Sequence, residues 1–149
     1  MPPPSMFHDA TRERFQRRID RLTPDSERQW GKMSVDQMVC HLSDQLRLAL
    51  GELSARPVAG PMRLAPIRRF AIDYLPWPHG TKGPRETFST QPVGLQSDIS
   101  KLRALVERFG SRGAQREWPD HPLFGRMSGP LWGRLTCKHF DHHLRQFGA

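Results

Sequence analysis

The residues most able to do chemistry lie near the C-terminal end, where three of the seven histidines fall within five positions. In a helix, His139 and His143 project from one face, one turn apart, whereas His142 points about 100° away from His143. Two imidazoles with this spacing can bind one transition-metal ion, as in the His-Glu-x-x-His helix of metalloproteases. Because the glutamate of that motif is missing here, the sequence argues against a protease. A third ligand must then come from elsewhere in the chain.

His41 is the candidate for that third ligand, because it falls on the inner stripe of a helix predicted over residues 35–50. Three neutral imidazoles bind zinc, nickel, iron or copper well, and three protein ligands leave coordination positions open, as in catalytic sites. An ion held in this way acts as a Lewis acid or lowers the pKa of a bound water or thiol. We therefore predict a metal site at His41, His139 and His143. The sequence does not identify catalytic or cofactor-binding residues.

A purely structural explanation of the histidines stays open at this point. Neutral rings in a helical core can be satisfied by hydrogen bonds to Gln45, Gln146 or Asp141. The two cysteines, Cys40 and Cys137, lack the spacing of a zinc finger. We expect each cysteine to be a small buried hydrophobic residue.

The remaining histidines are expected to lie outside the metal site. His79 and His121 occur in proline-rich loops and are expected at the surface, although either could line the mouth of the site. His142 is expected to face a neighbouring helix or solvent. His8 falls in a segment expected to be a tail.

Four amphipathic segments are predicted to position these residues as helices. Each has apolar residues at helical spacing and polar residues on its other faces. The segments cover residues 9–22, 35–50, 95–109 and 128–147. Ser34 and Gln37 have the spacing of a capping box at the start of the second segment, and Ser128 is an N-cap for the last.

The arrangement of these segments predicts the fold class. Residues 52–94 are rich in proline and glycine and predict a long irregular connection, with a short helix near residues 62–74. Four long helices in this order predict an all-α, up-down-up-down four-helix bundle with a long Pro-rich connection between the second and third helices. We expect residues 1–8 to form a flexible tail and residues 9–149 to form one domain.

Composition restricts the class of partner. The chain of 149 residues carries a net charge of +8, but its arginines are spread along the sequence without interleaved aromatic residues, so a solvated face is favoured over specific nucleic-acid binding. No apolar run is long enough to predict a membrane partner, and the start of the chain does not resemble a signal peptide. Two cysteines without a disulfide framework favour a cytoplasmic protein.

Several segments resemble the DinB/YfiT-like superfamily, and most closely a branch of it whose function is unknown. The matching residues are Trp30-Gly31-Lys32-Met33-Ser34-Val35-x-Gln37-Met38-x-x-His41-Leu42, then His121-Pro122-x-Phe124-Gly125 and Trp132, and finally His139-x-x-His142-His143-x-x-Gln146. The resemblance extends from Arg21 to Gly148. Its pieces are weak individually and fairly specific in combination.

The resemblance implies a four-helix bundle, often a homodimer, in which three histidines hold a divalent metal such as zinc, nickel or iron. Transferred by position, the ligands are His41, His139 and His143, and His142 takes the place of a histidine that is not a ligand. Characterised relatives include transferases and isomerases that use bacillithiol or mycothiol, and a metal-dependent hydrolase. We therefore expect a metal-dependent enzyme, specifically a low-molecular-weight-thiol S-transferase acting on a small molecule. The alternatives are a hydrolase and a non-enzymatic small-molecule or stress-response binding module.

Overall fold

The computed structural model describes residues 3–81 and 83–149, which contain five α-helices, two short 3₁₀ helices and no β-strand. The prediction of an all-helical protein is therefore confirmed. The α-helices are α1 (Asp9–Asp20), α2 (Val35–Ala49), α3 (Ala65–Asp73), α4 (Leu95–Arg112) and α5 (Gly129–Gln146), and the 3₁₀ helices are η1 (Pro61–Arg63) and η2 (Arg85–Phe88). Within the described part of the chain, no helix has the length and apolar character needed to cross a lipid bilayer.

Helix starts follow the local signals in the sequence. The Ser34 hydroxyl accepts a hydrogen bond from the Gln37 amide, and the Gln37 side chain accepts one from the Ser34 amide, which completes the capping box of α2. At the start of α5, the Ser128 hydroxyl accepts from the amide of Leu131. These caps satisfy backbone donors that have no partner inside the helix.

The end of α4 differs from the prediction, because the helix continues past Gly110 to Arg112 and ends at Gly113, which has a φ of 83°. Gly110 lies under the side chain of Arg12, where a β-carbon would be 2.5 Å from the guanidinium carbon. This glycine therefore provides room for a neighbouring helix, whereas Gly113 is the one that ends α4.

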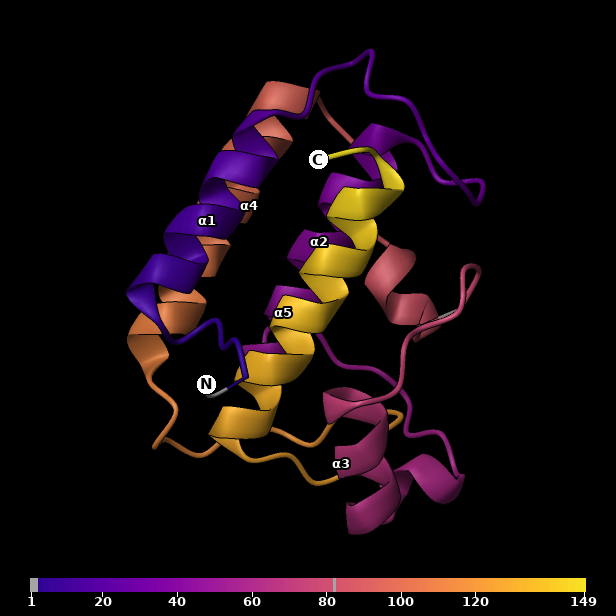
Figure 1. Cartoon of the computed structure of the whole chain (residues 1–149), viewed down its shortest axis with the longest axis vertical. Coiled ribbons are helices and arrows are strands. Elements are labelled where there is room, and N and C mark those ends of the chain that lie inside the picture. Colours follow the sequence, from indigo (N-terminus) through magenta and orange to yellow (C-terminus); the bar gives the residue numbers. More distant parts are fainter. Residues whose placement is uncertain (1–2, 82) are drawn as a thin grey trace.

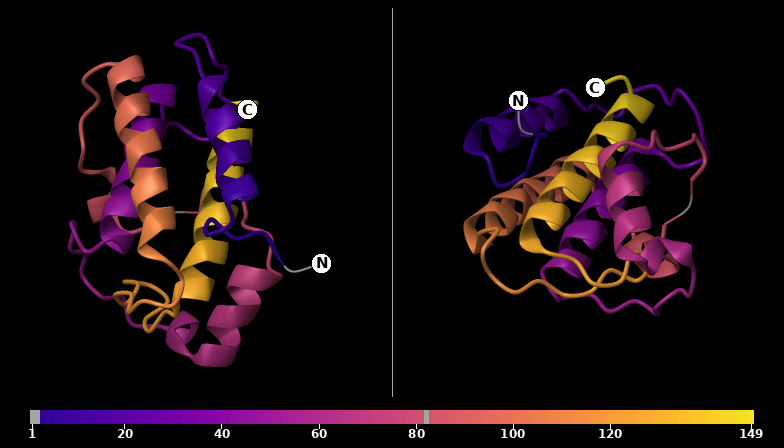
Figure 2. Two further views of the ribbon diagram at one scale, coloured as in Figure 1. Left: turned by 90° about the vertical axis from the view of Figure 1, so that its left-hand side faces the viewer. Right: turned by 60° about the horizontal axis from the view of Figure 1, so that its bottom comes forward.

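The four long helices lie side by side around a shared core (Figures 1 and 2). Helix α2 packs against α4 and α5, and α1 packs against the same two helices from the opposite side. The largest fully buried side chains in this core are Trp132, Phe109 and Phe140. Burial of such side chains contributes most of the stabilisation of helices in a globular protein.

The connection between α2 and α4 is long, as predicted, and it forms one wall of the site. The short helix expected near residues 62–74 is present as α3, which packs against α5. The 3₁₀ helix η2 packs against α2, and this contact brings Thr87 and Phe88 onto the ring of His41.

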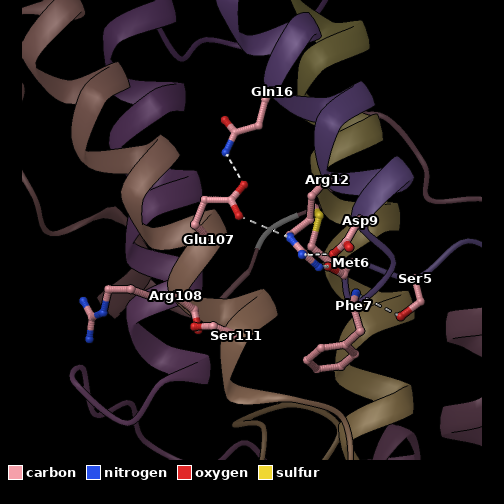
Figure 3. A network of polar contacts seen from close by, with 9 residues as sticks. All are labelled: Ser5, Met6, Phe7, Asp9, Arg12, Gln16, Glu107, Arg108 and Ser111. Carbon is pink, nitrogen blue, oxygen red and sulfur yellow. Dashed lines mark hydrogen bonds and ion pairs between the residues drawn. The ribbon is translucent and has the colours of Figure 1, made fainter.

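The N-terminal segment departs from the expected tail over residues 1–8. Residues 1–2 lie outside the described part, but Met6 has no exposed surface and its amide donates to the carbonyl of Gly133 at 3.2 Å. Phe7 stacks on Phe109 with a ring separation of 4.9 Å. Figure 3 shows Arg12 turned toward this segment, where its guanidinium donates to the Met6 carbonyl at 2.9 Å. Met6 therefore belongs to the core, and the partly buried Phe7 packs against it.

Candidate metal centre

Two helices bring His41, His139 and His143 together. Each ring offers one nitrogen, and these three nitrogens lie within 4.8 Å of one another. The Nε2 atoms of His41 and His139 are 2.9 Å apart, although the two residues are 98 positions apart in the chain. The ring centroids are separated by 4.7 to 4.8 Å. No other group of this kind occurs among the residues that the structure describes.

Burial keeps these imidazoles neutral at neutral pH. Desolvation lowers the pKa of His41 to about 4 and that of His143 to about 3. The pKa of His139 is lowered well below its usual value, first by desolvation and then by the two neighbouring rings. A neutral imidazole retains a lone pair, which is the form that binds a metal ion.

The outward nitrogens of two rings are fixed by hydrogen bonds. The Nδ1–H of His41 donates to the Thr87 carbonyl at 2.8 Å. The Gln146 amide donates to the Trp30 carbonyl at 3.0 Å, so its Oε1 faces Nδ1 of His143, which donates at 2.9 Å. In both rings the proton is therefore on Nδ1, and Nε2 keeps its lone pair. The hydrogen bond to Thr87 or Gln146 also fixes the orientation of the ring, as is typical of residues that support histidine ligands.

Backbone geometry around Gly31 allows Gln146 to take this position. Gly31 has a φ of 81°, and a β-carbon there would lie 2.7 Å from Nε2 of Gln146. A residue with a side chain would therefore be strained by the positive φ and would also displace the amide. This close approach explains the glycine that follows Trp30.

One pair of donor nitrogens already has the spacing that a divalent transition metal requires. Two nitrogens bonded to one ion at 2.0–2.1 Å are separated by about 2.9 to 3.4 Å, depending on whether the geometry is octahedral or tetrahedral. The 2.9 Å between Nε2 of His41 and Nε2 of His139 matches the lower end of this range. Nδ1 of His139 is buried without a hydrogen-bond partner in the described part of the chain, so this ring alone lacks an outer anchor.

A cavity of about 170 Å³ lies beside the three histidines. Its wall is mainly apolar and combines α2 and α5 with the 52–94 connection and the loop before α5. The apolar side chains in this wall include Leu48, Met62, Leu75, Trp77, Leu123, Phe124 and Leu135. Among the lining residues that the structure describes, none is an aspartate, glutamate, lysine, arginine or cysteine. This part of the wall is therefore suited to apolar groups.

Two further histidines line this cavity, and the sequence analysis named only His121 as a residue that could do so. His121 was expected at the surface but is only 7% exposed, and desolvation lowers its pKa to about 3. His142 is half-buried and lies near Trp30, with ring centroids 5.5 Å apart. His79 is exposed as expected, and its ring stacks on Trp30 at 3.8 Å. The His-Pro-x-Phe-Gly segment was the available signal for His121.

The aspartates and cysteines near the three histidines are not candidate metal ligands, because the aspartates have other partners and the cysteines are protonated. Asp44 is fully buried and accepts a hydrogen bond from the Thr90 amide at 3.1 Å, on the side of α2 that faces the connection. Asp141 pairs with two arginines. Burial raises the pKa of Cys40 to about 11 and that of Cys137 to about 12, so both are protonated thiols. The expectation that both cysteines are buried is confirmed.

Comparison with known proteins identifies the family. The family model described as "Protein of unknown function (DUF1569)" matches residues 6–149, so the chain belongs to this family. No curated protein and no solved structure matches the chain. The match begins at Met6, the first residue that is buried in the core.

Proposed function

We propose that this protein is a metal-dependent enzyme in which His41, His139 and His143 hold a divalent transition metal. The observation that carries the proposal is the convergence of three buried, neutral imidazoles, two of them with their outward nitrogens fixed by hydrogen bonds. Three protein ligands leave coordination positions open, which is the arrangement of a catalytic rather than a structural site. The adjacent cavity gives a small molecule access to that side of the centre.

The most favoured activity is S-transfer from a low-molecular-weight thiol to a small electrophile. A bound divalent ion lowers the pKa of a thiol or water and so supplies a nucleophile. None of the described lining residues is a carboxylate that could act as a general base, which favours a thiol, because its own pKa of about 8.5 is far below that of water. In the transfer, the thiol proton leaves to solvent and sulfur bonds to an electrophilic carbon. The leaving group departs with the electron pair of the broken bond.

The protein residues have separate tasks in this scheme. Thr87 and Gln146 hold two of the rings in the tautomer whose lone pair faces the centre. The apolar wall excludes water from the electrophile, which limits competing hydrolysis. The stacking of Phe88 on His41, at 4.1 Å and 7° between ring planes, keeps that ring from turning.

Metal analysis of purified variants tests the centre itself. We expect about one equivalent of transition metal in the wild-type protein and a loss of it in His41→Ala and His139→Ala. His79→Ala is the matched control, because His79 is an exposed histidine outside the cluster, and it should retain the metal. Retention of metal by folded His41→Ala would refute the assignment.

Activity assays separate the candidate functions. A panel of thiols and electrophiles should show turnover that disappears with chelator and returns with metal. Turnover with water alone would favour a metal-dependent hydrolase. Binding without any turnover would favour a small-molecule binding module, an alternative motivated by the lack of a carboxylate among the described residues of the cavity wall.

We further propose that the family belongs to the DinB/YfiT-like superfamily and that α1, α2, α4 and α5 form its up-down-up-down bundle. The support is the packing of each of these helices against two others and the origin of the three histidines in α2 and α5. An experimental structure with bound metal tests this proposal. A different helix order around the core, or ligands from other helices, would contradict it.

A further inference from the structure

The tautomer of His121 is determined by its surroundings. Its Nδ1 accepts hydrogen bonds from the backbone amides of Leu123 at 3.0 Å and Phe124 at 3.2 Å. A ring nitrogen that accepts from two amides cannot carry a proton, and burial keeps the ring neutral. The single proton of the ring is therefore on Nε2.

The loop around His121 holds this ring rigidly. The His121 and Gly125 backbones exchange two hydrogen bonds, at 2.7 and 2.8 Å. Arg63 donates to the carbonyl of Pro122 at 2.9 Å, and Arg68 donates to that of Phe124 at 2.8 Å. These contacts fix the backbone of the loop, so rotation of the ring would break the two bonds from the amides of Leu123 and Phe124 to Nδ1.

The Nε2–H of His121 is left as an unused donor. It makes no hydrogen bond within the described part of the chain, and the ring belongs to the cavity wall shared with the three-histidine cluster. Because the ring lines the cavity, this donor is available to a ligand or water inside it, and the hydrogen bond that either would accept is favourable. The donor thus points to an acceptor group in whatever occupies the cavity.

We propose that this cavity binds a small, mainly apolar molecule whose hydrogen-bond acceptor, such as a carbonyl oxygen, accepts from Nε2–H of His121. The volume of about 170 Å³ suits such a molecule, because an apolar cavity of about 150 Å³ holds benzene. The described part of the wall is mainly apolar, which favours an apolar body for the occupant. The proposal rests on the proposed function only in calling the occupant a substrate, because the binding itself requires only His121 and the cavity.

A matched pair of probes tests the donor. Acetophenone and ethylbenzene are similar in size, and only acetophenone has a carbonyl oxygen. Their affinities are measured by NMR titration of the full-length protein and of His121→Asn. Asparagine keeps an oxygen near the position of Nδ1 for the two loop amides but has no group at the position of Nε2. We expect the ratio of acetophenone to ethylbenzene affinity to fall about three- to tenfold in the variant.

A second variant tests the location. Ala71 is buried and lines the cavity, so Ala71→Leu fills part of its volume. Both probes should bind more weakly to this variant, with little change in their ratio. An unchanged ratio in His121→Asn would overturn the role of the donor, and unchanged affinities in Ala71→Leu would overturn the cavity as the binding site. If His121→Asn does not fold, competition between the two probes in Ala71→Leu still decides the location.

The same titrations after chelator treatment separate this proposal from the metal centre. The probe ratio should persist in the metal-free protein and in His41→Ala, because neither change touches the His121 loop. A persistent ratio with no metal in the wild-type protein would refute the proposed function and leave the cavity proposal intact. If the preference for acetophenone disappears when the metal is removed, the carbonyl depends on the metal, and the claim that His121 alone supplies the hydrogen bond is refuted.

Discussion

Replacement of Gln146 by leucine tests whether the hydrogen bonds behind the histidines determine metal affinity. The side chain of Gln146 is only 4% exposed and makes two hydrogen bonds, one to the Trp30 carbonyl and one from Nδ1–H of His143. Gln146→Leu keeps most of the volume and removes both bonds. His143 then loses the partner that fixes its tautomer and its orientation.

The magnitude follows from these two contacts. Loss of an outer partner of a metal-bound histidine typically weakens metal binding by 10- to 100-fold. The free energy of unfolding of the metal-free protein should fall by about 1–3 kcal/mol, because the Trp30 carbonyl and the His143 donor lose their partner. Metal affinity is measured by competition with a chromophoric chelator, and the free energy of unfolding by urea titration.

A second buried glutamine is the matched control. Gln16 is 8% exposed and its amide donates to the carbonyl of Arg103 and to the carboxylate of Glu107, both at 3.2 Å, in the contact between α1 and α4 (Figure 3). Gln16→Leu should lower the free energy of unfolding by a similar amount and leave metal affinity unchanged. If Gln146→Leu binds metal within twofold of the wild type, or if both variants lose affinity equally, the reasoning is refuted.

Three further predictions follow from the burial and backbone geometry. Because the buried histidines have pKa values of about 3 to 4 when folded and about 6.5 when unfolded, the free energy of unfolding of the metal-free protein should fall from pH 6 to 4, by up to about 1.4 kcal/mol per pH unit for each of these rings. Urea titrations of His121→Asn should show a shallower fall, and an equal slope would contradict the burial of that ring. Met6→Ala should lower the free energy of unfolding in urea titrations by about 2–5 kcal/mol, because Met6 is buried. His8→Ala, at an exposed position, should change it by less than about 0.5 kcal/mol. Equally small effects of both substitutions would favour a flexible tail over residues 1–8. Gly31→Ala should weaken metal binding about tenfold or more by displacing Gln146, which chelator competition measures, and unchanged affinity would mean that the amide adapts.

Helix positions could be predicted from the sequence because their signals are local. The capping box at Ser34 and the N-cap at Ser128 depend on residues three positions away, and the prediction placed both helix starts correctly. The helix end at Gly110 was wrong because a glycine can serve either a turn or a close contact. Which of the two applies depends on Arg12, about a hundred residues away in the chain.

Within the candidate site, the pairing of His139 with His143 follows from helical periodicity alone. The choice of His41 as the third ligand rested on its place on the inner stripe of another helix and on the resemblance to a family. No local rule predicts that residues 98 positions apart in the chain are in contact. The buried state of His121 could not be predicted either, because its loop is held by arginines from the 52–94 connection and not by its own neighbours.

The sequence alone thus determined where the helices lie, which face of each is apolar, and that two imidazoles share one turn of the last helix. These properties depend on the spacing of residues along a single helix, which is fixed by 3.6 residues per turn. Only the tertiary structure decided the distance from His41 to that pair, the burial of Met6 in the core, and the position of His121 across the cavity. Each of these depends on how separate elements pack against one another. That packing is determined by the shapes of many side chains together, which a short sequence pattern does not reveal.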